Sequence, residues 1–433
     1  MRRASLIGVA AAAALVLAAC SSGDSTDSTA TETVEETTTE TVEEGTEEAA
    51  GGIEPLNVHI VAAKTGIISP FDIQPGESFQ MAMDEINAAG GIGGQQVKVT
   101  WEDTQSDPAL TTQLAEAAVA DGANIIVTTC DFDFAAPAAT VAQANGIPAI
   151  SLCASDRKHA DLTTIGDLAF SPSPGNFWKG SAAGQFAYEN GWRNAYVLTD
   201  DLLEYTKSLS AYFKGAFTDL GGAVVGEDVF TGNEQLDPAP NVTRLRSAAA
   251  NADVIVIPSV VPAATTMIKA IRDAGIETPI LMPGAAVDGT LVTGSIPDIS
   301  NFYSLPFACM PEYCEGDPNP KVAEFNEKFK AYTGAAPVLA YPVLSYEMAY
   351  ALKAAVEAAG STEGGAVRDA LETLPPTDYL TGPINWSDIC HNAQGRDMRV
   401  VEYQNGKGTF LQLIKPTVIA KTDPGNPCEA VLG

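Results

Sequence analysis

Two hydrophobic patterns alternate along most of the chain: short β-rich runs and longer helical stretches. The β-rich runs are continuously apolar, so both faces of each strand are expected to be covered. In the first half we predict strands at Val58–Ala63, Val97–Glu102, Asn124–Thr129 and Ala149–Leu152, with helices at about Glu77–Ala89, Pro108–Asp121 and Ala135–Asn145. This order favours an α/β fold with a doubly wound parallel sheet.

The alternation starts again after the proline-rich passage Ser171–Pro174. Strands are predicted at Ala195–Thr199, Val224–Val229, Val254–Pro258 and Ile280–Met282, and helices at about Phe177–Glu189, Tyr205–Leu220, Thr243–Ala250 and Ala263–Ala274. A β run at Phe302–Phe307 and three helical stretches follow, at about Val322–Tyr332, Tyr341–Ala358 and Gly365–Thr373. The last two β runs, Met398–Tyr403 and Thr409–Ile414, flank the hairpin turn Asn405-Gly406. A second α/β lobe is therefore expected.

The N-terminus is typical of a secretory signal. Arg2 and Arg3 precede the apolar run Leu6–Ala19, which is too short to span a bilayer comfortably and ends in small residues. The segment Leu17–Cys20 resembles a lipobox, which implies a signal peptide over residues 1–20 and diacylation of Cys20. The alternative is an ordinary signal peptide with a chance cysteine.

Composition indicates a spacer followed by a large exported domain. Residues 21–53 are rich in Ser, Thr and Glu and cannot bury enough apolar surface to fold, so we expect a disordered acidic spacer. About 380 residues remain, enough for two lobes of ordinary domain size. A formal net charge of −31 excludes the balance of a nucleic-acid-binding protein.

Beyond Cys20 the sequence contains six cysteines, an even number that suggests three disulfides in an exported chain. Fifteen pairings are possible for six cysteines. From strand adjacency and proximity we predict the pairs Cys130–Cys153, Cys309–Cys314 and Cys390–Cys428. A zinc site is less favoured, because there is no CxxC pair and there are only three histidines. Neither a metal nor a cofactor is expected.

Four segments, in order, carry a resemblance to a known family: Asp84–Ile92, Asp121–Asn124, Asn145–Ile150 and Thr381–Trp386. Over roughly residues 55 to 415 the chain resembles the type I periplasmic binding proteins, specifically the leucine/isoleucine/valine-binding proteins that serve ABC importers. The resemblance implies two doubly wound lobes joined by three hinge crossovers, with ligand between them. We place the crossovers near Ser171, Leu305 and Leu380. Lobe 1 would comprise 54–170 plus 306–380, lobe 2 would comprise 171–305 plus 381–418, and 419–433 would form a tail.

In lobe 1 the resemblance places ligand contacts at three strand ends. Phe71 falls at an aromatic position over the ligand, although it could instead pack within its lobe. The segment Cys130–Phe134, which includes Asp131, Phe132 and Asp133, lies between a strand and a helix N-terminus. The third contact is Cys153-Ala154-Ser155, where Ser155 matches a hydroxyl that binds the ligand carboxylate.

The candidate residues of lobe 2 depart from the family pattern. Gly284 falls where branched-chain binders hold the ligand ammonium with a glutamate, with Asp288 four residues on. Val260 replaces an aromatic residue, and Tyr205 could close over the ligand. In lobe 1, Asp131 and Asp133 would repel an anionic ligand and attract a cationic or amide group. We expect one of the two to cap the helix and the other to face the cleft.

The leading hypothesis is a solute-binding lipoprotein of an ABC importer. We expect it to be a monomer that is anchored by lipid at the extracytoplasmic face of the cell membrane and docks on a permease. Its ligand would be a small polar organic molecule: an amino acid, an amide, an amine or a small aromatic compound. A sensor that presents ligand to a membrane receptor is the second hypothesis. A secreted hydrolase is less favoured, because the chain has no GxSxG or HExxH motif, and no histidine (His59, His159 or His391) has an obvious nucleophile partner.

Overall fold

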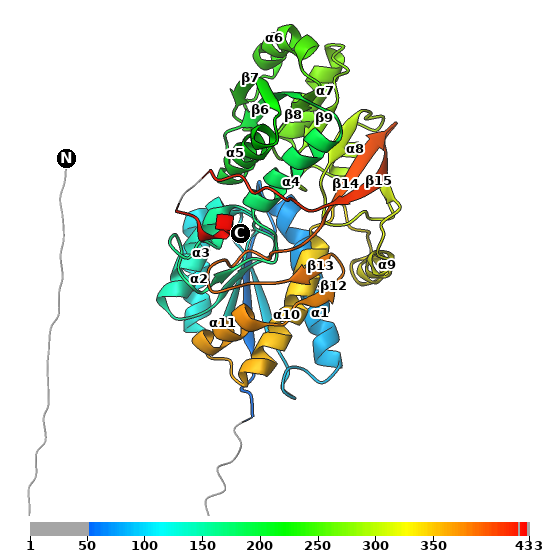
Figure 1. Ribbon diagram of the computed structural model, residues 1–433. Helices are drawn as coiled ribbons and strands as arrows, with labels where there is room; N and C mark the ends of the chain where they lie inside the picture. Colours follow the sequence, from blue (N-terminus) through cyan, green and yellow to red (C-terminus); the bar gives the residue numbers. More distant parts are fainter. Residues whose placement is uncertain (1–51, 423–424, 431–433) are drawn as a thin grey trace, which may run out of the picture. The chain divides into compact units, whose positions relative to one another are not determined.

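The structure is a computed structural model that describes residues 52–422 and 425–430 (Figure 1). The predicted signal peptide, Cys20 and nearly all of the predicted spacer lie outside the described residues. Among the described helices, none combines the length and apolarity that crossing a membrane requires.

A five-stranded sheet forms the centre of lobe 1. Its strand order is β2-β1-β3-β4-β5, and all four neighbouring pairs are parallel. The strands are β1 (Asn57–Ala62), β2 (Lys98–Asp103), β3 (Ile125–Thr128), β4 (Ala149–Ser151) and β5 (Ala169–Phe170). Parallel pairing places the carboxyl ends of all five strands at the same edge of the sheet.

Helices cover both faces of this sheet, as the continuous apolar strands predict (Figure 1). One face packs against α1 (Ser69–Ala88), α10 (Pro342–Ala359) and α11 (Gly364–Thr373). The other packs against α2 (Pro108–Ala120) and α3 (Phe132–Ala144), through alanines that allow close approach. The helix α1 begins at Ser69 rather than at about Glu77, because Pro70 is accepted in its first turn. Phe71 is therefore helical and does not lie in a loop.

Lobe 2 is built on an eight-stranded sheet of order β11-β15-β14-β10-β9-β8-β6-β7. Its strands are β6 (Asn194–Asp200), β7 (Ala223–Phe230), β8 (Val254–Val256), β9 (Ile280–Met282), β10 (Phe302–Ser304), β11 (Cys314–Glu315), β14 (Met398–Gln404) and β15 (Lys407–Ile414). Five neighbouring strands of this sheet are parallel, in the order β7-β6-β8-β9-β10. The strand β14 is antiparallel to both β10 and β15. The predicted hairpin turn joins β14 to β15, with Asn405 and Gly406 both at positive φ. The hairpin was thus predicted, and its antiparallel pairing with β10 extends the parallel part of the sheet.

The remaining elements complete the two lobes. Lobe 2 carries α4 (Asn176–Glu189), α5 (Glu204–Asp219), α6 (Ala239–Ala248), α7 (Ala263–Asp273) and the short α8 (Gly289–Thr293). The helix α9 (Lys321–Thr333) contacts α1, and β12 (Thr377–Tyr379) pairs with β13 (Gly382–Ile384) in a separate two-stranded sheet.

The chain crosses between the two large sheets three times within the described residues: after β5, between β11 and α10, and before β14. The second and third crossings differ from the predicted positions. The strand β11 pairs with β15, so the predicted boundary at 306 places it in the wrong lobe. Trp386 and Ala393, predicted in lobe 2, pack in the core of lobe 1.

A buried ion pair fixes the third crossing. Arg396 lies 2.9 Å from Glu347 of α10, and the Thr381 backbone N–H donates to the same carboxylate over 2.7 Å. The indole N–H of Trp178 in α4 donates to the Arg396 carbonyl oxygen over 2.7 Å. This crossing is thereby held to helices of both lobes.

All three predicted disulfides are confirmed: Cys130–Cys153, Cys309–Cys314 and Cys390–Cys428. The last one ties the C-terminal segment to the chain just before the third crossing. In that segment Glu429 accepts a hydrogen bond of 2.8 Å from the Tyr212 hydroxyl of α5. The described residues of the predicted tail, 419–422 and 425–430, are therefore attached to the folded domain.

We predict that the Cys390–Cys428 bridge stabilises the fold more than the Cys309–Cys314 bridge. The two pairs are similarly buried but close loops of 38 and 5 residues. Loop-closure entropy corresponds to about 4 kcal/mol for the longer loop and about 2 kcal/mol for the shorter one. Replacing each pair by serines and measuring denaturant unfolding should reproduce that order. Equal losses would show that the entropic account does not apply here.

Candidate ligand-binding site

A cavity of about 310 Å³ lies between the two lobes, at the carboxyl ends of strands from both sheets. Most of the side chains that line it are apolar or aromatic. The lining comprises Ile67, Ile68, Phe71, Cys130, Asp131, Asp133, Phe134 and Tyr341 from lobe 1, and Leu202, Leu203, Tyr205, Lys207, Gly232, Val260, Val261, Pro262 and Ala286 from lobe 2.

A buried aspartate organises the lobe 1 wall. Asp72 of α1 accepts hydrogen bonds from the backbone N–H groups of Ala63 and Cys130, over 2.9 and 2.8 Å. These two residues follow β1 and β3, so one carboxylate joins two strand ends. Burial raises the pKa of Asp72 to about 7, against the lowering effect of both hydrogen bonds. The disulfide from Cys130 to Cys153 joins the end of β4 to the same wall.

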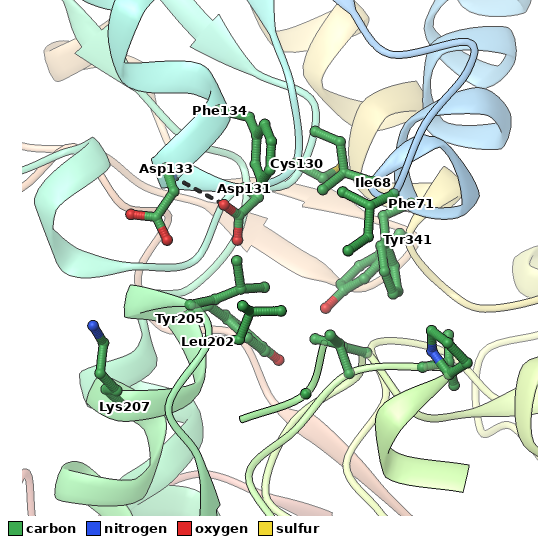
Figure 2. A pocket seen from close by; sticks show the side chains of 17 residues that line it. Ile68, Phe71, Cys130, Asp131, Asp133, Phe134, Leu202, Tyr205, Lys207 and Tyr341 are labelled. Atoms are coloured by element: carbon green, nitrogen blue, oxygen red, sulfur yellow. Dashed lines mark hydrogen bonds between the residues drawn. The ribbon is translucent and has the colours of Figure 1, made fainter. Parts of the chain in front are cut away.

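Asp131 caps α3 and also lines the cavity. Its carboxylate accepts from the backbone N–H of Asp133 over 2.9 Å, as an N-cap aspartate does. Figure 2 shows that this carboxylate points toward Leu202 and Tyr205 of the opposite lobe. Burial raises the pKa of Asp131 well above its ordinary value, and the nearby charge of Asp133 raises it further.

Asp133 connects the two lobes directly. Its Oδ2 accepts from the backbone N–H of Glu204, the first residue of α5, over 3.0 Å. A carboxylate at the start of a helix also interacts favourably with the helix dipole. Both aspartates therefore cap a helix, one in its own lobe and one across the cleft.

A second buried aspartate organises the lobe 2 wall. Asp200, at the end of β6, accepts from the backbone N–H groups of Leu202 and Gly232 over 3.1 and 2.9 Å. It also accepts from the Ser259 hydroxyl over 2.8 Å. The loops after β6, β7 and β8 are thus held by one carboxylate, and Val260 follows directly at the cavity.

Aromatic rings form the inner part of the cavity. Phe71 meets Tyr341 edge to face with ring centroids 6.4 Å apart, and Figure 2 shows the hydroxyls of Tyr341 and Tyr205 turned toward each other. The buried Tyr205 hydroxyl has no hydrogen-bond partner of good geometry among the described residues. The buried Lys179 amine lies 4.7 Å from the Tyr205 ring centroid, and burial lowers its pKa well below its ordinary value.

Five of the predicted contact residues line the cavity: Phe71, Asp131, Asp133, Tyr205 and Val260. Six do not: Phe132, Cys153, Ala154, Ser155, Gly284 and Asp288. For the five residues that line the cavity, contact with a ligand stays a prediction. For the other six, the structure shows different surroundings.

Local packing explains the second group. Phe132 is half-buried below the Lys158 amine, which lies 5.9 Å from its ring centroid. The Ser155 hydroxyl is buried and shares a 2.6 Å hydrogen bond with Ser173. A Cβ on Gly284 would lie 2.5 Å from the Tyr205 hydroxyl, so this glycine leaves room for the tyrosine.

Asp288 belongs to the core of lobe 2. Its Oδ1 accepts from the Tyr403 hydroxyl over 2.6 Å and from the Ser304 hydroxyl over 2.9 Å. The side chain is fully buried, and burial raises its pKa to about 6. The expectation that Asp288 faces a ligand is corrected by this geometry, which joins α8 to β10 and β14.

A family model described as periplasmic binding protein matches residues 55–408. The chain belongs to the periplasmic binding protein family. This family binds solutes and is not a family of enzymes, and its members act outside the cytoplasm. Among curated relatives, Leu/Ile/Val-binding protein homolog 1 of Brucella melitensis is 25% identical over 343 residues, which cover 75% of this chain and 84% of the relative.

Solved structures show the same fold. The substrate-binding protein LivJ of Streptococcus pneumoniae, in complex with isoleucine, has a TM-score of 0.73 at 22% identity and covers 84% of this chain and 100% of its own. A solute-binding protein of R. palustris in complex with benzoate has a TM-score of 0.69 at 19% identity, with coverages of 87% and 100%.

Several cavity residues of this periplasmic binding protein were not singled out from the sequence. Tyr341 directly precedes α10, far along the chain from the other lobe 1 contacts, and no local pattern marks it. Lys207 reaches the rim from the first turn of α5, and Gly232 follows β7. The rule that ligands contact loops after parallel strands could have found Gly232 and Pro262.

We predict that Asp288→Asn removes a pH dependence of stability and leaves the cavity intact. Because the folded-state pKa of Asp288 is raised to about 6, the folded chain holds a proton that the unfolded chain releases near pH 4. Wild-type stability should therefore fall as pH rises from 4 to about 7, by about 2 kcal/mol more than in the variant. Urea unfolding of both proteins at several pH values measures the difference. Parallel profiles would contradict this assignment.

Proposed function

We propose that this chain is the solute-binding component of an ABC importer, and that it captures a small organic molecule between its two lobes without converting it. The observation that carries the proposal is the cavity itself, which both lobes line at the carboxyl ends of their parallel strands. Its volume lies at the lower end of the range for ligand pockets. The sequence predicted a small polar solute. Because most side chains that line the cavity are apolar or aromatic, we now favour a solute with an apolar body and few polar groups.

Closure of the lobes is the proposed mechanism of capture. The contact between Asp133 and the backbone N–H of Glu204 is one that opening would break, since the two residues belong to different lobes. A ligand that contacts both walls adds its own interactions to the closed form and shifts the population toward it. The closed form would then present surfaces of both lobes to the permease.

A lipid on Cys20 would hold the domain at the outer face of the membrane, with residues 21–53 as spacer. The lipobox-like sequence supports this anchoring, and we expect the domain to act as a monomer. Co-purification with a permease supports the importer role, whereas recovery of a signalling receptor instead would favour a sensor.

We predict that the purified mature chain releases a small organic molecule on denaturation, detectable by mass spectrometry. Adding this molecule to ligand-free protein at 100 times its dissociation constant should stabilise the fold by about 2.7 kcal/mol in a thermal-shift assay. Val260→Trp should abolish that shift because the indole fills the cavity. Val225→Trp, on the exposed face of the edge strand β7, is the matched control and should keep it. If both variants keep the thermal shift, the ligand binds somewhere other than this cavity.

We predict that Cys20→Ala moves the protein from the membrane fraction to the medium or the periplasmic extract. Without a thiol at the cleavage site no acyl chain can be attached, and the acidic spacer has no affinity of its own for an anionic bilayer. Fractionation and immunoblotting of cells expressing each form measure the change. A variant that stays fully membrane-bound would rule out lipid anchoring through Cys20.

A further inference from the structure

Acidic side chains outnumber basic ones at the cavity, where two aspartates and one lysine contribute to the lining. Asp131 and Asp133 line it, and no lysine or arginine among the described residues forms an ion pair with either. Lys207, at the rim, is paired with Glu204, which also accepts from the Lys158 amine. The charge of Asp133 also helps to raise the pKa of Lys207, whereas no cation acts on Asp131, which is the acid left uncompensated in a largely apolar setting.

A ligand carboxylate would find no favourable place at the lobe 1 wall. The N-terminus of α3 offers backbone N–H groups to an anion, but the carboxylate of Asp131 already occupies that position. Within the described residues this backbone N–H is the one donor to the Asp131 carboxylate, so its other oxygen is open to a ligand. An anion there would meet two aspartates, whereas an ammonium group would provide the missing charge.

The rest of the cavity lining, from both lobes, provides what an alkylammonium group needs besides a carboxylate. Tyr205 is nine-tenths buried and lines the cavity. Its hydroxyl interacts with the Tyr341 hydroxyl and the Ala286 backbone, but it makes no hydrogen bond of good geometry among the described residues, so it can accept from an ammonium N–H. Phe71 and Tyr341 add aromatic rings, whose faces favour a cation over a neutral group. Ile68, Val260 and their neighbours would enclose an apolar body.

From this geometry we propose that the cavity binds a hydrophobic amine that has no carboxylate, with its ammonium group between Asp131 and Tyr205 and its aliphatic or aromatic body against the apolar wall. The proposal rests on the proposed function, because it names the class of solute that is captured. Burial raises the pKa of Asp131 and so favours its neutral form, and an ammonium group beside it would lower that pKa again and favour the carboxylate.

Lys179 is the group that could favour an anion instead. Its amine is buried without a hydrogen-bond partner, close to the rings of Tyr205 and Phe307. It does not line the cavity, however, and burial disfavours its charged form. A Lys179→Met variant therefore belongs in the test.

The test compares pairs of probes that share a body. Titration calorimetry on the mature chain, freed of its ligand by reversible unfolding with the disulfides intact, would use 3-methylbutylamine against leucine and 2-phenylethylamine against phenylalanine and 3-phenylpropanoate. We expect at least one amine to bind at least tenfold more tightly than its carboxylate-bearing counterparts. Asp131→Asn should weaken that amine at least tenfold while the cap is kept, because asparagine caps helices as well as aspartate.

A matched control separates charge in the cavity from helix capping. Asp107 caps α2 in the same way, accepting from the backbone N–H of Ala109 over 2.8 Å, and it does not line the cavity. Asp107→Asn should change amine affinity by less than twofold. An equal loss in both variants would overturn the proposed role of Asp131.

The possible failures are distinguishable. If leucine, phenylalanine or 3-phenylpropanoate binds more tightly than its amine, the site prefers an anionic ligand, and the proposal is wrong while the importer role stands. Loss of this binding in Lys179→Met would identify Lys179 as the group that attracts the anion. If the molecule released from the native protein carries a carboxylate or no amine, the same conclusion follows. If no probe binds and no molecule is released, the proposed function fails as well.

Discussion

Hydrogen bonds from loop backbones to two buried aspartates hold the arrangement on which the cavity depends. Asp72 joins the ends of β1 and β3 in lobe 1, and Asp200 joins the loops after β6, β7 and β8 in lobe 2. Parallel strands end at a common edge, but their loops still need a partner for each buried N–H group. One carboxylate in each lobe satisfies several of them at once.

The strand ends determine the character of the cavity. The fold and its cavity follow from strand order, whereas the charge of the cavity depends on the few residues at the strand ends. Here Asp131 occupies the helix N-terminus with its own carboxylate, and Asp133 extends to the opposite lobe. In this chain the cavity is lined by aromatic and other apolar side chains together with two aspartates and one lysine.

Much of the fold could be predicted from the sequence, because continuous apolar strands between amphipathic helices specify a covered parallel sheet. The disulfide pairing was within reach too, since Cys130 and Cys153 follow adjacent strands. The hairpin of β14 and β15 was predicted, but the pairing of β14 with β10 and the place of β11 were not, as pairing across distant segments leaves no local pattern. Asp288 follows a strand as a contact residue would, but hydroxyls of Tyr403 and Ser304 draw it into the core. Tyr341 reaches the cavity only through tertiary packing.

We propose that this protein holds its solute in the cavity between the lobes. A crystal structure of the chain purified from its own cells, without removal of bound molecules, would show where the solute lies. We expect electron density for a compact molecule between the lobes, with a nitrogen atom within hydrogen-bonding distance of Asp131 and an apolar body against Phe71 and Val260. Density for the solute at another place on the protein, or a closed cavity filled by water alone, would contradict it.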